Sequence, residues 1–268
     1  LAAHHIYFEN ERLPVTEMDA MKGAYLGPSF SDEEIQAAAD SFKAKYKRYE
    51  ERSALYELVA RVLNEGNAIG WFQGRMEFGP RALGNRSILA DPRNPEMQKK
   101  LNLKIKFREG FRPFAPAVLA DDAKNYFDLT TPSPYMLLVQ QVKKELQNAV
   151  PENYHQQTIN QKLYFQKSNL PAITHIDYSA RIQTVHASTN KPFHDLLTAF
   201  KQLTGCSVLV NTSFNVRGEP VVCTPLEAYQ CFMRTEMDYL VIENYLFSKK
   251  DQPEWKEEGD WKKNMQPD

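Results

Sequence analysis

The chain has 268 residues, of which 42% are apolar, enough to bury the core of one large domain or two modest ones. Its formal net charge is −1, no apolar run approaches the roughly 18 residues that span a bilayer, and no signal peptide opens the sequence. Three cysteines without zinc-site or disulfide-framework spacing lead us to expect no metal site and a reducing, cytoplasmic environment.

The first predicted elements are two helices and a strand. Residues 1–30 have no regular pattern after what resembles the end of a helix, so we expect the chain to be part of a longer protein. Ser31 and Glu34 have the spacing of a capping box, and apolar residues recur at helical spacing from there to Tyr49. A second helix is predicted over residues 51–64, and a buried strand over 68–72.

Further helices and strands alternate along the rest of the chain, which predicts an α/β fold. Residues 128–170 are the exception, with one plausible strand at 135–142 in a polar stretch. The residues from Lys249 onward are mostly charged or polar, and we expect them to be loosely held, although Trp255 and Trp261 could dock. The other predicted elements are helices at 95–103, 193–203 and 225–233 and strands at 114–119, 207–210 and 239–242.

A glycine-rich loop after the first predicted strand carries the clearest functional signal. It reads FGPRALGNRSILADPR over residues 78–93, with Arg81 and Arg86 between glycines and prolines. Glycine lets backbone N–H groups turn toward a ligand, and arginine offers a rigid fork for phosphate or carboxylate oxygens. Residues 75–112 hold ten Lys/Arg and four Asp/Glu in a protein of nearly neutral charge. We therefore expect a bound anion here.

Three more polar patches lie beside predicted strands. Lys106 and Arg112 flank a glycine turn, where a point charge and an arginine fork could hold a phosphate from two sides. Arg181 enters a strand within SARIQTV. The segment after the predicted strand at 207–210 supplies neutral donors and one cation suited to phosphate or ribose: Asn211, Thr212, Ser213, Asn215 and Arg217.

Several common signatures are absent from the sequence. It has no GxxxxGK[ST] phosphate loop, no GxGxxG after a strand, no HExxH and no GxSxG. A nucleotide, if bound, is therefore held by arginines and neutral donors in a less common fold.

Together the strings FGPRALGNRSILADPR, KFREGFRPFAPAVL, SARIQTV and LVNTSFNVRGEPVV closely resemble the C-terminal region of NodU- and TobZ-type O-carbamoyltransferases over roughly residues 20–248. The resemblance implies a YrdC-like α/β fold, a twisted mixed sheet flanked by helices. It divides the chain into the end of an N-terminal actin-like transferase domain with its linker (1–30), the YrdC-like domain (31–248) and a polar tail (249–268). Most of the N-terminal domain is missing, and the chain alone should make the activated intermediate at most.

The resemblance also implies a reaction and a set of residues. The domain would form carbamoyladenylate from carbamoyl phosphate and ATP, with Mg²⁺ as helper, and the N-terminal domain would move the carbamoyl group to an acceptor hydroxyl. The YrdC-like signature of Lys, Arg and Ser-x-Asn maps onto Lys106, Arg112, Ser213 and Asn215. We assign carbamoyl phosphate to Arg81, Lys106 and Arg112, with a catalytic role, and nucleotide to Arg181, Asn211, Ser213, Asn215 and Arg217.

A non-catalytic structural domain is disfavoured, because all four polar patches lie next to the ends of predicted strands. Two other functions also remain open at this point. One is threonylcarbamoyladenylate synthesis from bicarbonate and threonine, which the arginines of the glycine-rich loop disfavour. The other is RNA binding, disfavoured because the basic residues alternate with glycine and proline and the isoelectric point is near neutral. We expect no membrane partner, and nucleic acid is an unlikely one.

Overall fold

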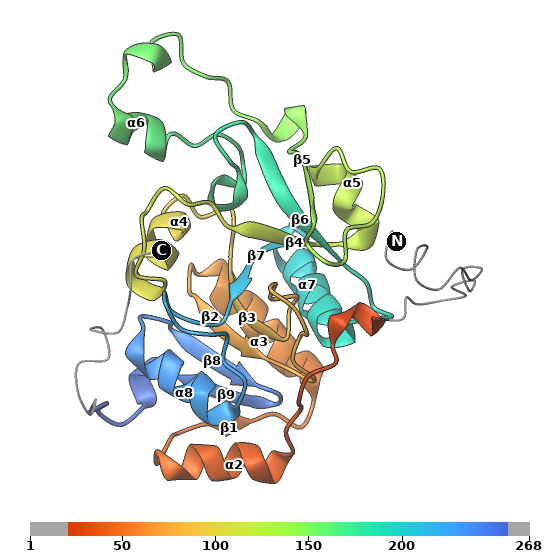
Figure 1. The fold of residues 1–268 in the computed structure, drawn as a ribbon, viewed down its shortest axis with the longest axis vertical. Helices are drawn as coiled ribbons and strands as arrows, with labels where there is room; N and C mark the ends of the chain where they lie inside the picture. Colours follow the sequence, from red (N-terminus) through yellow and green to blue (C-terminus); the bar gives the residue numbers. More distant parts are fainter. Residues whose placement is uncertain (1–20, 257–268) are drawn as a thin grey trace, which may run out of the picture.

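A computed structural model describes residues 21–256 of the chain. One sheet of nine strands runs through the molecule in the order β1-β9-β8-β2-β3-β7-β4-β6-β5 (Figure 1). The pairs β2–β8 and β4–β6 are parallel and the other neighbours are antiparallel, so the sheet is mixed. The strands are β1 Lys47–Arg48, β2 Ile69–Phe72, β3 Arg86–Ala90, β4 Ala115–Leu119, β5 Leu138–Gln141, β6 Ser179–Val185, β7 Val208–Ser213, β8 Tyr239–Ile242 and β9 Tyr245–Ser248.

Helices cover both faces of this sheet, and the central strands are therefore buried on both sides. Trp71 of β2 packs against Tyr56 of α3, with ring centroids 6.0 Å apart, and α3 packs on α7. On the opposite face of the sheet, Gly70 and Phe247 lie in the same row of paired residues across neighbouring strands. Phe247 packs there against Tyr229 of α8, and α8 lies beside α2 (Figure 1). The helices are α2 Asp32–Ser41, α3 Arg52–Asn64, α4 Met97–Lys100, α5 Ala123–Tyr126, α6 Ile159–Tyr164, α7 Lys191–Thr204 and α8 Pro225–Arg234.

The predicted α/β class, with a mixed sheet flanked by helices, is confirmed. The capping box at the start of α2 forms as expected, with the Ser31 side chain accepting from the Glu34 N–H and the Glu34 carboxylate accepting from the Ser31 N–H. Neither β1 nor β9 was predicted. In the part of the chain that the structure describes, no helix has both the length and the apolar character needed to cross a membrane.

The first helix is shorter than its apolar pattern predicts. It ends at Ser41, and Lys43 then takes a positive φ of 52°, which turns the chain out of the helix. Tyr46 consequently packs on Tyr245 and Phe247 of β9 instead of continuing the helical face. The extension of this helix toward Tyr49 is therefore wrong.

The predicted N-terminal segment (1–30) and polar tail (249–268) lie partly outside the described residues. The predicted helix end at 1–5 and Trp261 both belong to the part that is not described. Within the described part, the expectation of a loose tail is wrong for residues 249–256. The ammonium of Lys249 donates to the carbonyls of Phe232 and Thr235, and Trp255 packs against Phe42 and Tyr229. At the other end, residues 21–30 pack directly against the domain core, where Gly27 N–H donates to the carbonyl of Met76 over 2.9 Å.

Candidate functional site

A small cavity of about 190 Å³ lies where β7 ends and β3 and β4 begin, and we call it the arginine cavity. Three arginines from separate parts of the chain, Arg81, Arg108 and Arg181, line it, and no carboxylate does. Arg81 belongs to the loop between β2 and β3, and Arg181 to strand β6. The full lining is Pro80, Arg81, Ala82, Arg108, Pro113, Phe114, Ala115, Met136, Arg181, Asn211, Thr212 and Ser213.

Arg81 and Arg181 form no ion pair with any carboxylate among residues 21–256. Burial, and then the positive charge of Arg81, lower the pKa of Arg181. The Nε atoms of both side chains are also buried without a hydrogen-bond acceptor in the described structure. Two guanidinium groups that repel each other and have unused donors are the physical signature of a site for an anion.

A second cavity of about 340 Å³, the lysine cavity, adjoins the first, since Arg108 and Ser213 line both. Its cations are Lys106, Arg108 and Arg217, and Glu219 is its carboxylate. The remaining lining residues are Ser213, Asn215, Val216 and Gly218. Together the two cavities are lined by five cationic side chains, of which Arg108 is shared.

Lys106 is buried, and its Nζ contacts oxygen atoms of two residues of the loop after β7. These are the Ser213 carbonyl at 2.5 Å, the Asn215 side-chain oxygen at 2.8 Å, the Asn215 carbonyl at 3.0 Å and the Ser213 hydroxyl at 3.2 Å. Burial and the nearby Arg108 lower the pKa of Lys106 to about 7, whereas the Cys231 thiol has the opposite effect. Lys106 is thus close to losing its proton at neutral pH, and a bound anion would hold that proton in place.

The helix before Lys106 changes from α-helical to π-helical winding just ahead of this residue. After α4 the chain continues as a π-helical turn, Leu101–Ile105, and the Lys106 N–H donates to the Leu101 carbonyl over 2.8 Å. Asn102, inside this turn, accepts from Arg108 Nε at 2.7 Å and donates to the Arg112 carbonyl at 2.8 Å. Wide turns of this kind are often found at functional sites.

Arg112 lines neither of the two cavities. Its Nε contacts Glu109 at 3.1 Å, and its side chain lines a third, mainly apolar cavity of about 540 Å³ with Phe111 and Ile176. Glu109 also lies 3.7 Å from Arg217. The structure therefore brings together Lys106, Ser213, Asn215 and Arg217 on one side and Arg81, Arg181 and Asn211 on the other, but not Arg112.

Asn211 holds the protein's own loop. It is 1% exposed, and its Nδ2 donates to the Ala82 carbonyl at 3.1 Å and to the side-chain oxygen of Gln183 at 2.6 Å. Asn215 is similarly engaged, since its Nδ2 donates to the Glu219 carbonyl at 2.7 Å. Both amide NH₂ groups therefore shape the site from within, and a ligand role for either residue stays a prediction.

The three arginines of the string at 78–93 have three different environments, although the sequence grouped them. Arg86 is fully buried in β3, with its guanidinium 3.4 Å from the centre of the Phe72 ring and donating to backbone carbonyls such as that of Gln73. Burial lowers its pKa to about 10. Arg86 therefore joins the loop to the sheet and does not face the cavity.

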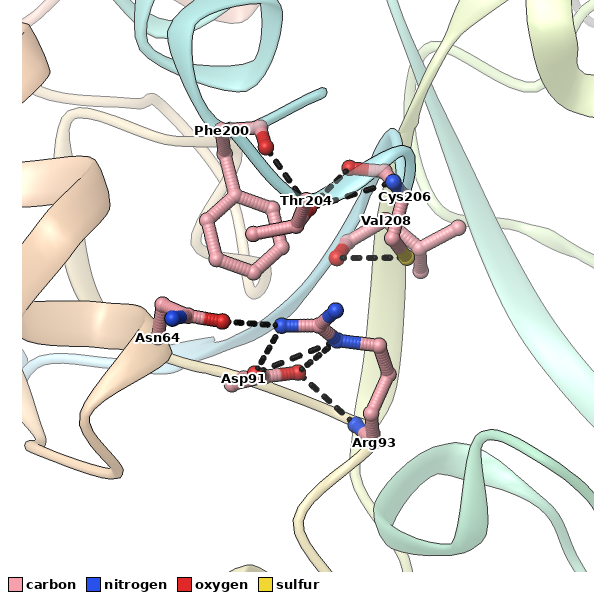
Figure 2. Close-up of polar contacts among 7 residues, drawn as sticks. All are labelled: Asn64, Asp91, Arg93, Phe200, Thr204, Cys206 and Val208. Carbon is pink, nitrogen blue, oxygen red and sulfur yellow. Dashed lines mark hydrogen bonds and ion pairs between the residues drawn. The ribbon is translucent and has the colours of Figure 1, made fainter. Parts of the chain in front are cut away.

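Arg93 stabilises the other end of the same strand (Figure 2). Its guanidinium lies between Asp91 and Asn64, at 2.6 Å from the Asp91 carboxylate and 2.7 Å from the Asn64 side-chain oxygen. It also lies 5.2 Å from the ring centre of Phe200 in α7. These contacts tie β3 to α3 and α7, so among the arginines of the string only Arg81 lines the arginine cavity.

Comparison with known proteins agrees with this description of the chain. A family model described as "Carbamoyltransferase C-terminus" matches residues 60–249. The chain belongs to the carbamoyltransferase family. It is 54% identical to an uncharacterized protein of Synechocystis over 100% of this chain and 44% of that protein. It is 37% identical to the nodulation protein NolO of Bradyrhizobium diazoefficiens over 90% of this chain and 39% of that protein.

The carbamoyltransferase chain described here thus spans less than half the length of these two relatives. Among solved structures, full-length HypF in a phosphate- and nucleotide-bound form has a TM-score of 0.45 at 17% identity, over 71% of this chain and 25% of HypF. Sua5 of P. abyssi in complex with L-threonine has a TM-score of 0.44 at 12% identity, over 74% and 48% of the two chains. Likenesses of this size add nothing to the assignment.

Two residues of this carbamoyltransferase domain escaped the sequence interpretation. Arg108 is shared by the two cavities, and its position two residues after Lys106 was the available signal. Glu77 is 6% exposed, and one of its carboxylate oxygens accepts from the N–H groups of Leu83 and Asn85 at 2.7 Å and of Arg86 at 3.2 Å. Glu77 thereby organises the loop that carries Arg81, and nothing in the sequence distinguishes it from a surface glutamate.

Proposed function

We propose that this domain forms carbamoyladenylate from carbamoyl phosphate and ATP, which an N-terminal transferase domain of a longer protein then uses on an acceptor hydroxyl. The observation that carries the proposal is the arginine cavity, where Arg81 and Arg181 face one small space without a carboxylate. The adjoining lysine cavity supplies a second set of cations for a second anionic ligand. Family membership and the greater length of the relatives support the transferase context.

The chemistry proceeds in two balanced steps. Water cleaves carbamoyl phosphate to carbamate and inorganic phosphate. A carbamate oxygen then attacks the α-phosphorus of ATP, the new O–P bond forms, and the bond to the β-phosphate oxygen breaks to release pyrophosphate. Both steps concentrate negative charge, so fixed cations that are already in place lower the barrier by electrostatic stabilisation and positioning.

The cavities revise how the predicted residues share this work. Arg81 and Arg181 would hold the phosphate of carbamoyl phosphate, whereas Lys106, Ser213 and Arg217 would contact the ATP phosphates. Arg108, which lines both cavities, would stabilise charge where carbamate meets the α-phosphate. Compared with the prediction from the sequence, Arg181 thus moves from the nucleotide group to the carbamoyl phosphate group, and Lys106 moves in the opposite direction. Arg112, which lines neither cavity, has no place in this assignment.

Mg²⁺ would have to come with ATP. Among residues 21–256, no group of three His, Cys, Asp or Glu side chains could hold a metal ion. Glu219, the carboxylate of the two cavities, lies 3.8 Å from Arg234. A Mg²⁺ ion here would be held mainly by the ATP phosphate oxygens and by water, as is usual for this ion.

The test is carbamoyl-phosphate-dependent exchange of labelled pyrophosphate into ATP. We expect exchange with the wild-type chain and its loss in Lys106→Ala, because this change removes a cation from the lysine cavity. Lys104→Ala is the matched control, since Lys104 is an exposed neighbour paired with Glu236. Full exchange in Lys106→Ala would contradict the role of Lys106, and no exchange in the wild type would contradict the proposed reaction.

The same assay separates the alternatives. If bicarbonate and threonine support exchange and carbamoyl phosphate does not, the domain is a threonylcarbamoyladenylate synthase. RNA binding that weakens steeply with salt, without exchange in either assay, would indicate the nucleic-acid function.

A further inference from the structure

The peptide groups of Leu83, two residues after Arg81, are held from two sides. The Leu83 N–H donates to Glu77 at 2.7 Å. The Leu83 carbonyl accepts from the Tyr25 hydroxyl at 2.9 Å and from Gln183 Nε2 at 2.7 Å. Because Glu77 and Gln183 are buried and Tyr25 is half-buried, the backbone on the C-terminal side of Arg81 has little freedom to rotate.

Tyr25 reaches Leu83 from the N-terminal side, 58 residues earlier in the sequence. Its segment runs beside the start of the loop between β2 and β3 (residues 73–85), which carries Arg81 and is called the arginine loop below. The Met76 N–H donates to the Pro28 carbonyl at 2.9 Å and the Phe78 N–H donates to the Ala24 carbonyl at 2.7 Å. The Tyr25 hydroxyl also accepts from Asn190 Nδ2 at 3.1 Å. Desolvation raises the pKa of Tyr25 well above its usual value, so the hydroxyl keeps its proton and can donate.

The Tyr25 ring also lies behind the wall of the arginine cavity. It packs on the buried cluster of Ala24, Leu83 and Met136, to which Ala115 contributes, and both Met136 and Ala115 line the cavity. The neighbouring Gly23 has a φ of 72°, and a Cβ atom there would lie 2.7 Å from the Tyr25 ring. A side chain at position 23 would therefore displace the ring from its place against this cluster.

We propose that Tyr25 is a positioning residue for the anion site, which fixes Arg81 through the carbonyl of Leu83. This inference rests on the proposed function, because it takes a phosphate group as the ligand of the arginine cavity. Tyr25 does not line the cavity itself. Its effect reaches the ligand only through the loop, and so depends on Arg81 being present.

The experiment is titration of the 268-residue chain with inorganic phosphate by calorimetry. Tyr25→Phe keeps the ring and removes one hydrogen bond to Leu83, so we expect phosphate to bind about fivefold more weakly. Tyr229→Phe is the matched control, because it removes a similar hydroxyl bond, to Gln252 at 2.9 Å, on the α8 side of the sheet. The control should bind phosphate as the wild type does.

A double-mutant cycle separates positioning from general destabilisation. If Tyr25 acts through Arg81, then Tyr25→Phe has no further effect on phosphate affinity in an Arg81→Gln background. Equal losses in both backgrounds, unchanged affinity in Tyr25→Phe, or an equal loss in Tyr229→Phe would each overturn the inference. If the wild-type chain itself does not bind phosphate, it is the proposed function that fails.

Discussion

Arg81 and Arg181 share one cavity, and the positive charge of Arg81 adds to burial in lowering the pKa of Arg181. Neither side chain has a carboxylate partner within residues 21–256. A protein gains no stability from two cations held in this way, because each must be desolvated near a like charge. Such an arrangement is useful only when an anion binds between them.

The first prediction is that Arg181→Gln weakens phosphate binding without lowering the stability of the protein. The variant loses one charged donor, so phosphate affinity should fall by roughly tenfold to a hundredfold, which corresponds to about 1.5–3 kcal/mol. Its melting temperature without phosphate should equal or exceed that of the wild type, because a repulsion is removed. Calorimetric titration and thermal unfolding measure the two effects. A large drop in melting temperature with intact binding would instead mean that Arg181 is structural.

The second prediction is that a substitution of Arg93 lowers the stability of the protein without weakening phosphate binding. Arg93→Met leaves the nearly buried Asp91 carboxylate without its partner, and we expect a loss of roughly 1–3 kcal/mol in the free energy of unfolding, since the Arg93 side chain is 31% exposed. Phosphate affinity of the folded fraction should not change. Urea unfolding and phosphate titration of Arg93→Met and Arg181→Gln side by side test this contrast. Weaker phosphate binding by Arg93→Met would show that the two ends of β3 are coupled.

The different roles of these arginines show which part of the site could be predicted from the sequence. The string at 78–93 indicated an anion site, because arginines among glycines are unusual in a loop that serves only solubility. Which arginine faces the arginine cavity depends on where β3 begins, and Arg86 is paired with Phe72 in the sheet by that register. Strand register is set by packing across the whole sheet, which a single loop sequence does not record.

The local elements were more predictable than the site. The capping box of α2 and the helix stop at Gly205, which has a φ of 76°, follow from neighbouring residues alone. Arg108 could not be assigned in this way, because the two cavities it lines are built from segments far apart in the chain. The role of Glu77 is local, but it depends on how the loop folds around its carboxylate. The edge strand β1 was missed because its two residues become a strand through pairing with β9, which lies far away in the sequence.

The third prediction follows from Lys106. Its pKa is lowered from 10.5 to about 7 by burial, so between these values the unfolded chain binds more protons than the folded one. The contribution of Lys106 therefore makes the protein more stable as pH rises from about 7 toward 10, and the cost of burying the charge is fully present below pH 7. Lys106→Met should remove this part of the pH dependence.

Urea unfolding of the wild type and of Lys106→Met at pH 7, 8 and 9 measures the difference. The comparison is needed because burial also lowers the pKa of Lys249, to about 8, and this lysine contributes a similar slope to both proteins. Lys104→Met, at an exposed position, is the control and should retain the wild-type profile. Identical pH profiles for the wild type and Lys106→Met would contradict the prediction.

The fourth prediction concerns Gly84, which closes the arginine loop against α7. Gly84 has a φ of 105°, and a Cβ atom there would lie 2.2 Å from Cδ1 of the buried Phe193. Gly84→Ala should therefore combine backbone strain with overpacking and lower the free energy of unfolding by about 2–5 kcal/mol. Phosphate affinity should fall as well, because a loop displaced from Phe193 carries Arg81 with it.

Gly205→Ala is the matched comparison. Gly205 also has a positive φ, of 76°, but a Cβ atom there would meet nothing within 4 Å, so only the backbone cost of about 1–2 kcal/mol applies. Its position at the end of α7 leaves the arginine loop untouched, and phosphate binding should remain at the wild-type level. Chemical unfolding and phosphate titration of both variants give the two differences. Equal destabilisation by the two substitutions would show that Phe193 moves aside freely and that α7 does not hold the loop in place.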